Sequence, residues 1–185
     1  EVVPPHVNSS GREFTVADGK IYFALSAIKG CGGSAAEAVV RNREKDGLYR
    51  DLFDFCERIE PSACGKSAIE SLVKSGSFDD LEANRQQLSQ IIERALQAGS
   101  SALSDRRSGQ KNLFEQFSDS DKNEEVPLPR VPEFEERERL LMEKEVLGFY
   151  LSSHPLAEHQ DLLANVCSHT TTRLPTLNDR TEVVV

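Results

Sequence analysis

The sequence predicts a mainly α-helical fold that carries a short N-terminal β-hairpin, a polar linker and a C-terminal helical segment. Three observations support this prediction. Apolar residues recur at helical spacing along most of the 185 residues, with breaks at glycine or proline. Residues 1–23 instead form short extended runs around Asp18–Gly19. Residues 99–132 are polar and rich in serine and proline, so they bury too little apolar area to order the chain.

The elements follow from local patterns. Asp18–Gly19 separates Phe14–Val16 from Ile21–Phe23, and an Asp-Gly pair between two such runs is typical of a hairpin turn. The period becomes helical at Ala24, and Gly30–Gly33 breaks it. Further helices are predicted from Ser34 onward and at 50–59, 66–74, 82–98, 133–151 (ended by His154–Pro155) and 156–165.

The glycine-rich break predicts a binding site for phosphate. Apolar residues on both sides indicate two short helices that pack together, and Gly30 and Gly32 permit a tight turn between them. Ser34 and Glu37 have the spacing of a capping box, so the second helix is expected to start there. Backbone amides at a helix start bind anions. The candidate residues are Lys29, Gly30, Cys31, Gly32, Gly33 and Ser34, with added charge expected from Arg41 or Arg43.

This pattern resembles the helix-hairpin-helix motif of DNA-binding proteins, with Cys31 in place of the usual aliphatic residue between the glycines. The alternative is an ordinary helical corner that needs glycine only to turn. A weaker second motif runs from Ile69 through Gly76 to Asp79, with the next helix expected from Glu82. Because it has one glycine, we expect it to pack against the first as a pseudo-symmetric mate. Asp79, at its end, is interpreted as a helix cap.

Composition limits the possible functions. The net charge of -9 argues against a protein that coats nucleic acid. However, residues 20–100 hold 11 basic and 12 acidic side chains, whereas 115–150 hold 5 basic and 11 acidic, so the acidity is concentrated in the second stretch. Four cysteines without a CxxC pair suit a reducing compartment, and no apolar run is long enough to cross a membrane. We therefore expect a cytoplasmic protein with no membrane partner.

No catalytic or metal site is predicted. His154, His159, Cys167 and His169 match no zinc spacing, and no serine or cysteine has a partner for nucleophilic catalysis. The acidic residues lie on predicted helices or in the linker and do not converge as metal-assisted phosphoryl transfer requires. No cofactor is expected on these residues.

One short apolar group interrupts the polar linker. Leu113 and Phe114 have no local core to enter, so they either fill a pocket on another protein or dock on their own helical domain. Gln110 precedes them and offers both a hydrogen-bond donor and an acceptor. Gln110–Phe114 resembles the peptide with which bacterial polymerases bind the beta sliding clamp.

Four runs together resemble the alpha subunits of bacterial DNA polymerase III, the C-family replicative polymerases. These runs are Ile21–Gly33, Leu52–Cys56, Leu72–Asp79 and Glu143–Leu156. The resemblance implies an enzyme, a DNA-directed DNA polymerase, whose catalytic carboxylates and two Mg ions lie in an upstream palm domain. It also implies partners: duplex primer-template DNA, the beta sliding clamp and other polymerase subunits.

The resemblance further implies how the chain is divided. The expected parts are the end of the fingers region (1–24), a tandem helix-hairpin-helix domain (25–98), a linker with the clamp-binding peptide (99–132), a helical connector (133–179) and the start of an OB-fold (180–185). The sequence has no initial methionine, and Glu182–Val185 looks like an interrupted strand. We therefore expect a piece of a longer protein.

Three alternatives remain open from the residues. A protein-interaction module without a DNA role would suit the net charge. The DNA-binding half of a repair nuclease or helicase complex would share the hairpins, but would not need Leu147–Tyr150 or the clamp-like peptide. An error-prone paralogue of the same polymerase family would share all of these features.

Overall fold

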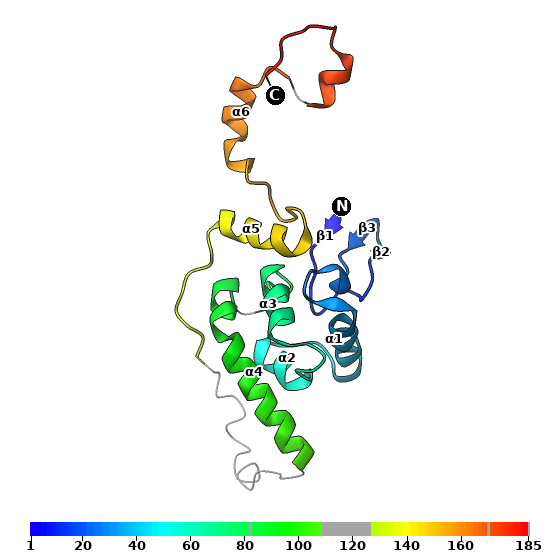
Figure 1. Ribbon diagram of the computed structural model, residues 1–185, viewed down its shortest axis with the longest axis vertical. Helices are drawn as coiled ribbons and strands as arrows, with labels where there is room; N and C mark the ends of the chain where they lie inside the picture. The colour runs from blue at the N-terminus through cyan, green and yellow to red at the C-terminus, as the bar shows by residue number, and fades with distance from the viewer. Residues whose placement is uncertain (82, 109–126, 170, 185) are drawn as a thin grey trace. The chain divides into compact units, whose positions relative to one another are not determined.

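The computed structural model describes residues 1–81, 83–108, 127–169 and 171–184, and it is mainly helical with one small sheet, as the sequence predicts (Figure 1). It divides into two units, Glu1–Leu151 and Ser152–Val185. The first unit contains, in chain order, β1 (Val2–Val3), β2 (Thr15–Ala17), β3 (Lys20–Tyr22), the 3-10 turn η1 (Leu25–Ala27), α1 (Gly32–Asp46), α2 (Leu52–Arg58), α3 (Lys66–Lys74), α4 (Arg85–Ser108) and α5 (Glu136–Leu147).

The N-terminal sheet contains the predicted hairpin and one strand that the sequence did not reveal. β2 and β3 pair antiparallel around Asp18 and Gly19, whose φ angles of 52° and 72° suit the tight hairpin turn. β1 pairs parallel to β3 and gives the order β1-β3-β2. A two-residue strand has too little alternation to be recognised from sequence.

The described helices lie where the sequence predicts helices, but several of their ends differ. α3 has the predicted bounds, and α2 lies inside the predicted range. α5 ends at Gly148, whose φ of 89° lets its amide bond back to the Lys144 carbonyl. The prediction that His154–Pro155 ends this helix is therefore wrong, because the left-handed glycine ends it earlier.

α4 continues ten residues beyond its predicted end at residue 98, so that predicted end is also wrong. Gly99 is buried where α4 crosses α2, and a Cβ atom at this position would overlap the Cys56 carbonyl. Gly99 therefore allows close packing of two helices and does not break one. A single sequence does not distinguish these two uses of glycine.

A buried guanidinium joins three of the helices. Arg85, 4% exposed, donates through Nε and Nη2 to Asp79 at 2.9 and 2.6 Å, and through Nη2 to Glu143, 2% exposed, at 3.1 Å. Asp79 thus binds Arg85, and its interpretation as a helix cap is wrong. Asn84 and Gln87 cap α4 instead, because each side chain accepts the other residue's backbone amide at 2.8 and 3.0 Å.

α5 is held against both hairpins of the first unit. The Val146 carbonyl accepts the Lys29 amide at 2.8 Å, and Glu145 pairs with Lys74 at the end of α3 at 2.8 Å. Figure 1 shows α5 across this end of α3. The first hairpin therefore depends on a helix more than a hundred residues later in the chain.

The second unit contains η3 (Ala157–His159), α6 (Gln160–Val166) and η4 (Thr171–Thr176). The first two cover the helix predicted at 156–165. None of the described residues in this unit is buried. Across both units, no helix within the described ranges is long and apolar enough to cross a membrane.

Replacing Glu143 by Leu is expected to lower the free energy of unfolding by roughly 3–5 kcal/mol, because it leaves Arg85 buried with one carboxylate fewer. The double variant Arg85→Met with Glu143→Leu removes the buried charge and should regain most of that loss. Urea denaturation followed by circular dichroism measures both. A double variant no more stable than Glu143→Leu would contradict the assignment of the loss to an uncompensated charge.

Replacing Gly99 by Ala should lower the free energy of unfolding by roughly 1–3 kcal/mol, because the added methyl group must displace the α2 backbone. Ser100→Ala, on the exposed face of the same helix, is the control and should be neutral or slightly stabilising. Thermal melts compare the two. Equal melting temperatures would mean that α2 and α4 do not cross closely at Gly99.

Candidate nucleic-acid interface

The first hairpin turn combines exposed backbone with one buried side chain. Gly30 and Gly32 are exposed and have φ angles of 91° and 70°, which side chains rarely adopt. Cys31 between them is 4% exposed and faces the core, and its amide donates to the Ile28 carbonyl at 3.0 Å. Burial raises the pKa of the Cys31 thiol to about 11, so the thiol is neutral near pH 7 and places no negative charge in the turn.

Gly30 also fixes the turn against α3. A Cβ atom on Gly30 would lie 2.5 Å from the Ser71 hydroxyl oxygen, so any side chain there would collide with α3. At Gly32 nothing lies within 4 Å of such an atom, and only the backbone angle favours glycine. The two glycines therefore differ: Gly30 is needed for packing and for φ, and Gly32 is needed for φ and faces open space.

α1 starts at this turn without a side-chain cap. Its N-cap residue, Cys31, makes no capping hydrogen bond, and its first turn holds no acidic residue. The amides of Gly32, Gly33 and Ser34 belong to the first turn of the helix, so they have no carbonyl four residues back inside the helix. Together with the helix dipole, they present three aligned donors and partial positive charge to an anion.

The predicted capping box at Ser34 and Glu37 is not formed. The helix begins two residues earlier, at Gly32, so Ser34 lies within its first turn. The Glu37 carboxylate instead lies 3.6 Å from Arg12 Nη1. Without that cap, the amides at the start of α1 stay available.

Arg12 is a candidate site residue that the sequence did not reveal. A Cβ atom on Gly33 would lie 3.7 Å from Arg12 Nη2, so the guanidinium is next to the start of α1. The Arg12 carbonyl accepts the Ser26 amide at 3.2 Å, and the Arg12 side chain is 53% exposed. Arg12 precedes the motif by about twenty residues in sequence, and only the folded N-terminal loop brings it there.

The other predicted cations differ in their surroundings. Lys29 is exposed beside the turn, and Arg41 is exposed on α1. Arg43 donates through Nη1 to the carbonyls of Val7 and Ser10 at 2.7 and 3.0 Å, which fixes it to the N-terminal loop. The expectation that Arg43 adds charge at the hairpin is therefore wrong, and Arg41 and Lys29 remain candidates.

The second hairpin has a different surface. Its amides at Gly76, Ser77 and Asp79 donate to carbonyls within the turn and α3 at 2.9–3.0 Å. The Arg85 guanidinium covers Gly76, where a Cβ atom would overlap it. This turn is therefore filled by the chain's own groups.

The remaining predicted sites have no described counterpart. Gln110, Leu113 and Phe114 lie outside the described residues. Among the residues that are described, no three His, Cys, Asp or Glu side chains lie together as metal ligands would.

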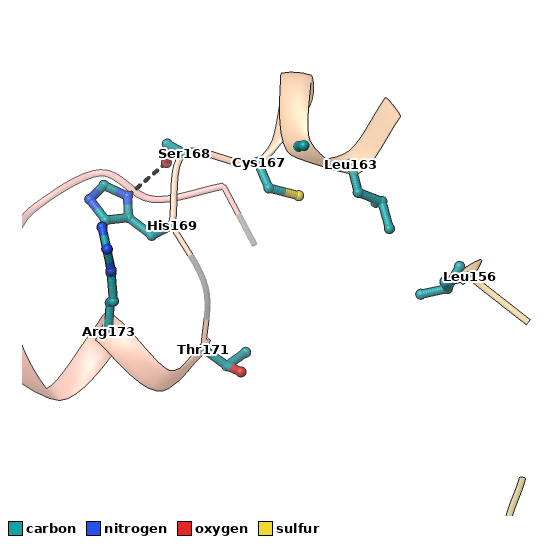
Figure 2. A pocket seen from close by; sticks show the side chains of 8 residues that line it. Leu156, Leu163, Cys167, Ser168, His169, Thr171 and Arg173 are labelled. Carbon is teal, nitrogen blue, oxygen red and sulfur yellow. Dashed lines mark hydrogen bonds between the residues drawn. The ribbon is translucent and has the colours of Figure 1, made fainter. Parts of the chain in front are cut away.

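The second unit has an open hollow of about 680 Å³ beside α6, shown in Figure 2, where His169 Nδ1 lies 2.9 Å from the Ser168 hydroxyl. This neighbouring pair has no acidic partner among the hollow's lining residues, so the hollow suggests no catalytic group.

Comparison with known proteins gives two findings. A family model described as a helix-hairpin-helix motif matches residues 1–88. The chain is 39% identical over 87% of its length to the DNA polymerase III subunit alpha of Deinococcus radiodurans, and 36% identical over 96% and 99% of its length to those of Pasteurella multocida and Vibrio cholerae. It spans 12%, 15% and 16% of these three relatives.

Proposed function

The chain belongs to the DNA polymerase III alpha subunit family, and from this premise we propose that it binds the sugar-phosphate backbone of duplex DNA through the first hairpin. The observation that carries the proposal is the uncapped start of α1, where three amides follow a turn built from exposed glycines. Arg12 lies beside them and would add a charged donor. Lys29 would add a second charge at the edge of the turn.

Binding of this kind does not read sequence. Backbone amides reach phosphate oxygens, which are the same at every base pair, and no residue of the turn is long enough to read base edges except Lys29. The hairpin contacts only one or two phosphates, so its affinity alone is modest and salt-dependent. Glu13 and Glu37, each within 3.6 Å of the Arg12 guanidinium, reduce that affinity further.

We assign no catalytic step to these residues. In the full-length protein we expect DNA-directed DNA synthesis, with two Mg ions held by carboxylates in the upstream palm domain. Bound divalent ions would stabilise the charge that develops in phosphoryl transfer. Among the residues that the structure describes, no carboxylate cluster fits such ions. We propose that this part of the protein instead holds duplex DNA.

The segment between α4 and residue 127 carries the second part of the proposal, a tether to the beta sliding clamp. Leu113 and Phe114 would supply burial energy in a pocket on the clamp, and Gln110 would fix the register by hydrogen bonds. A contact made by so few side chains gives weak affinity, on the order of micromolar. When the same chain is also bound to DNA, the peptide is held near the clamp at a high effective concentration. A weak affinity is then enough to keep the two proteins together. We also expect the full-length protein in the cytoplasm with other polymerase subunits.

Replacing Gly32 by Val should weaken duplex binding tenfold or more, a loss of about 1.4 kcal/mol, because the side chain strains the turn and covers the amides. Gly47→Val is the matched control. Gly47 also has a positive φ, 87°, and open space around it, but it lies at the other end of α1. Fluorescence anisotropy with a labelled duplex measures both, and equal binding by the two variants would refute the hairpin as the contact.

Replacing Leu113 and Phe114 by Ala should abolish binding to a bacterial beta sliding clamp, because both side chains that fill the pocket are lost. Isothermal titration of the 185-residue chain measures this. The control variant, Ser118→Ala with Ser120→Ala, changes two polar residues of the same linker and should bind as the unmodified chain does. If the variant without both apolar side chains still binds the clamp, Leu113 and Phe114 are not the contact and the proposed tether is refuted.

A further inference from the structure

The starts of α1 and α4 differ in one respect: the amides of α4 already have acceptors. Glu133 accepts the Arg85 amide at 3.0 Å and the Gln86 amide at 3.3 Å through its two carboxylate oxygens. Asn84 accepts the Gln87 amide at 2.8 Å. Three consecutive amides at the second hairpin's helix are therefore satisfied, whereas those of α1 have no side-chain cap.

Glu133 reaches α4 because residues 127–133, here called the docked segment, lie along its first turn. Gln87 donates to the Pro129 carbonyl at 2.9 Å, and Asn84 donates to the Val131 carbonyl at 3.2 Å. Leu128 packs on the hydrophobic core. Together with the two bonds that Glu133 accepts, four hydrogen bonds join the docked segment to residues 84–87, and Glu133 supplies its charged group in these bonds.

Beside Glu133, the structure has a small hollow of about 280 Å³ that Asp79, Asn84 and Arg139 also line. Arg139 Nε is buried there and has no hydrogen-bond partner in the part of the chain that the structure describes. A buried guanidinium nitrogen without an acceptor favours negative charge nearby. The carboxylate of Glu133 therefore lies where both the α4 amides and Arg139 favour an anion.

We propose that Glu133 acts as an internal substitute for a DNA phosphate and closes the second hairpin to nucleic acid, so that only the first hairpin of the pair binds the duplex. A carboxylate on two adjacent helix-start amides makes the contacts that a phosphate oxygen pair would make. Glu133 belongs to the same chain, so its carboxylate occupies the site without the loss of translational freedom that a separate DNA molecule would suffer on binding. This inference rests on the proposed function, since it assigns DNA to one of two related hairpins.

The test uses the 185-residue chain and a short labelled duplex over a series of salt concentrations. Replacing Glu133 by Ala exposes the Arg85 and Gln86 amides, so one further phosphate contact should form. With Arg139 beside the site to neutralise that phosphate, the slope of log affinity against log salt should become steeper by up to about 0.9. Glu135→Ala is the charge-matched control, because Glu135 is exposed and makes no side-chain capping bond. It should keep the original slope.

If Glu133→Ala folds poorly, a second variant and a second measurement test the same inference. Glu133→Gln keeps an oxygen that accepts an amide hydrogen but carries no charge, so it should fold and give a slope between those of Glu133→Ala and the unmodified chain. Inorganic phosphate should raise the melting temperature of Glu133→Ala more than that of Glu135→Ala. Equal slopes and equal phosphate effects for the Glu133 and Glu135 variants would overturn the inference.

The outcome is separable from the proposed function. If the unmodified chain and Gly32→Val bind DNA equally, the first hairpin is not the contact, and the proposed function fails. The comparison of Glu133→Ala with Glu135→Ala still decides the inference, because it depends only on the second hairpin. In the double variant Gly32→Val with Glu133→Ala, binding above that of Gly32→Val supports the inference, and no gain contradicts it.

Discussion

The buried guanidinium of Arg85 is the group on which the first unit depends. It binds Asp79 of the second hairpin, Glu143 of α5 and the Lys74 carbonyl at the end of α3. A buried charge is tolerated only when its donors have partners, so these three elements must meet at Arg85 for the core to form. α5 thereby gains a fixed position, and its Val146 carbonyl in turn holds the Lys29 amide beside the first hairpin. An ion pair in one hairpin thus positions the other.

The turns of the two hairpins have different surfaces. In the first, small residues leave the helix start bare, and the only buried side chain of the turn, Cys31, faces inward. In the second, Arg85 covers the turn at Gly76, and Glu133 accepts amides at the helix start. The first turn thus leaves amides for the phosphate contact that we propose, whereas the second turn is filled by side chains of the same chain. What separates them is the presence of side chains able to satisfy the amides.

Features set by neighbouring residues were predictable from the sequence, and those set by distant ones were not. The Asp18–Gly19 turn and the ends of α3 follow from local propensity, and the structure has them as predicted. The predicted end of α4 before Gly99 is wrong because this glycine is needed for close contact with α2, which lies more than forty residues earlier in the chain. Arg12 and Glu133 reach the helix starts from outside the motifs, and no local pattern marks either one. The candidate phosphate site was thus predictable in its backbone but not in its side chains.

The distribution of charge explains how an acidic chain can present a site for an anion. The net charge of -9 is dominated by the stretch that contains the docked segment and α5. Part of that acidity is not a solvated surface: Glu133 satisfies backbone amides and Glu143 satisfies a buried guanidinium. Charges used in this way repel a phosphate strand less than their number implies, because nearby positive groups offset their field. For this chain, the local field at each helix start is therefore a better guide to nucleic-acid binding than the overall charge.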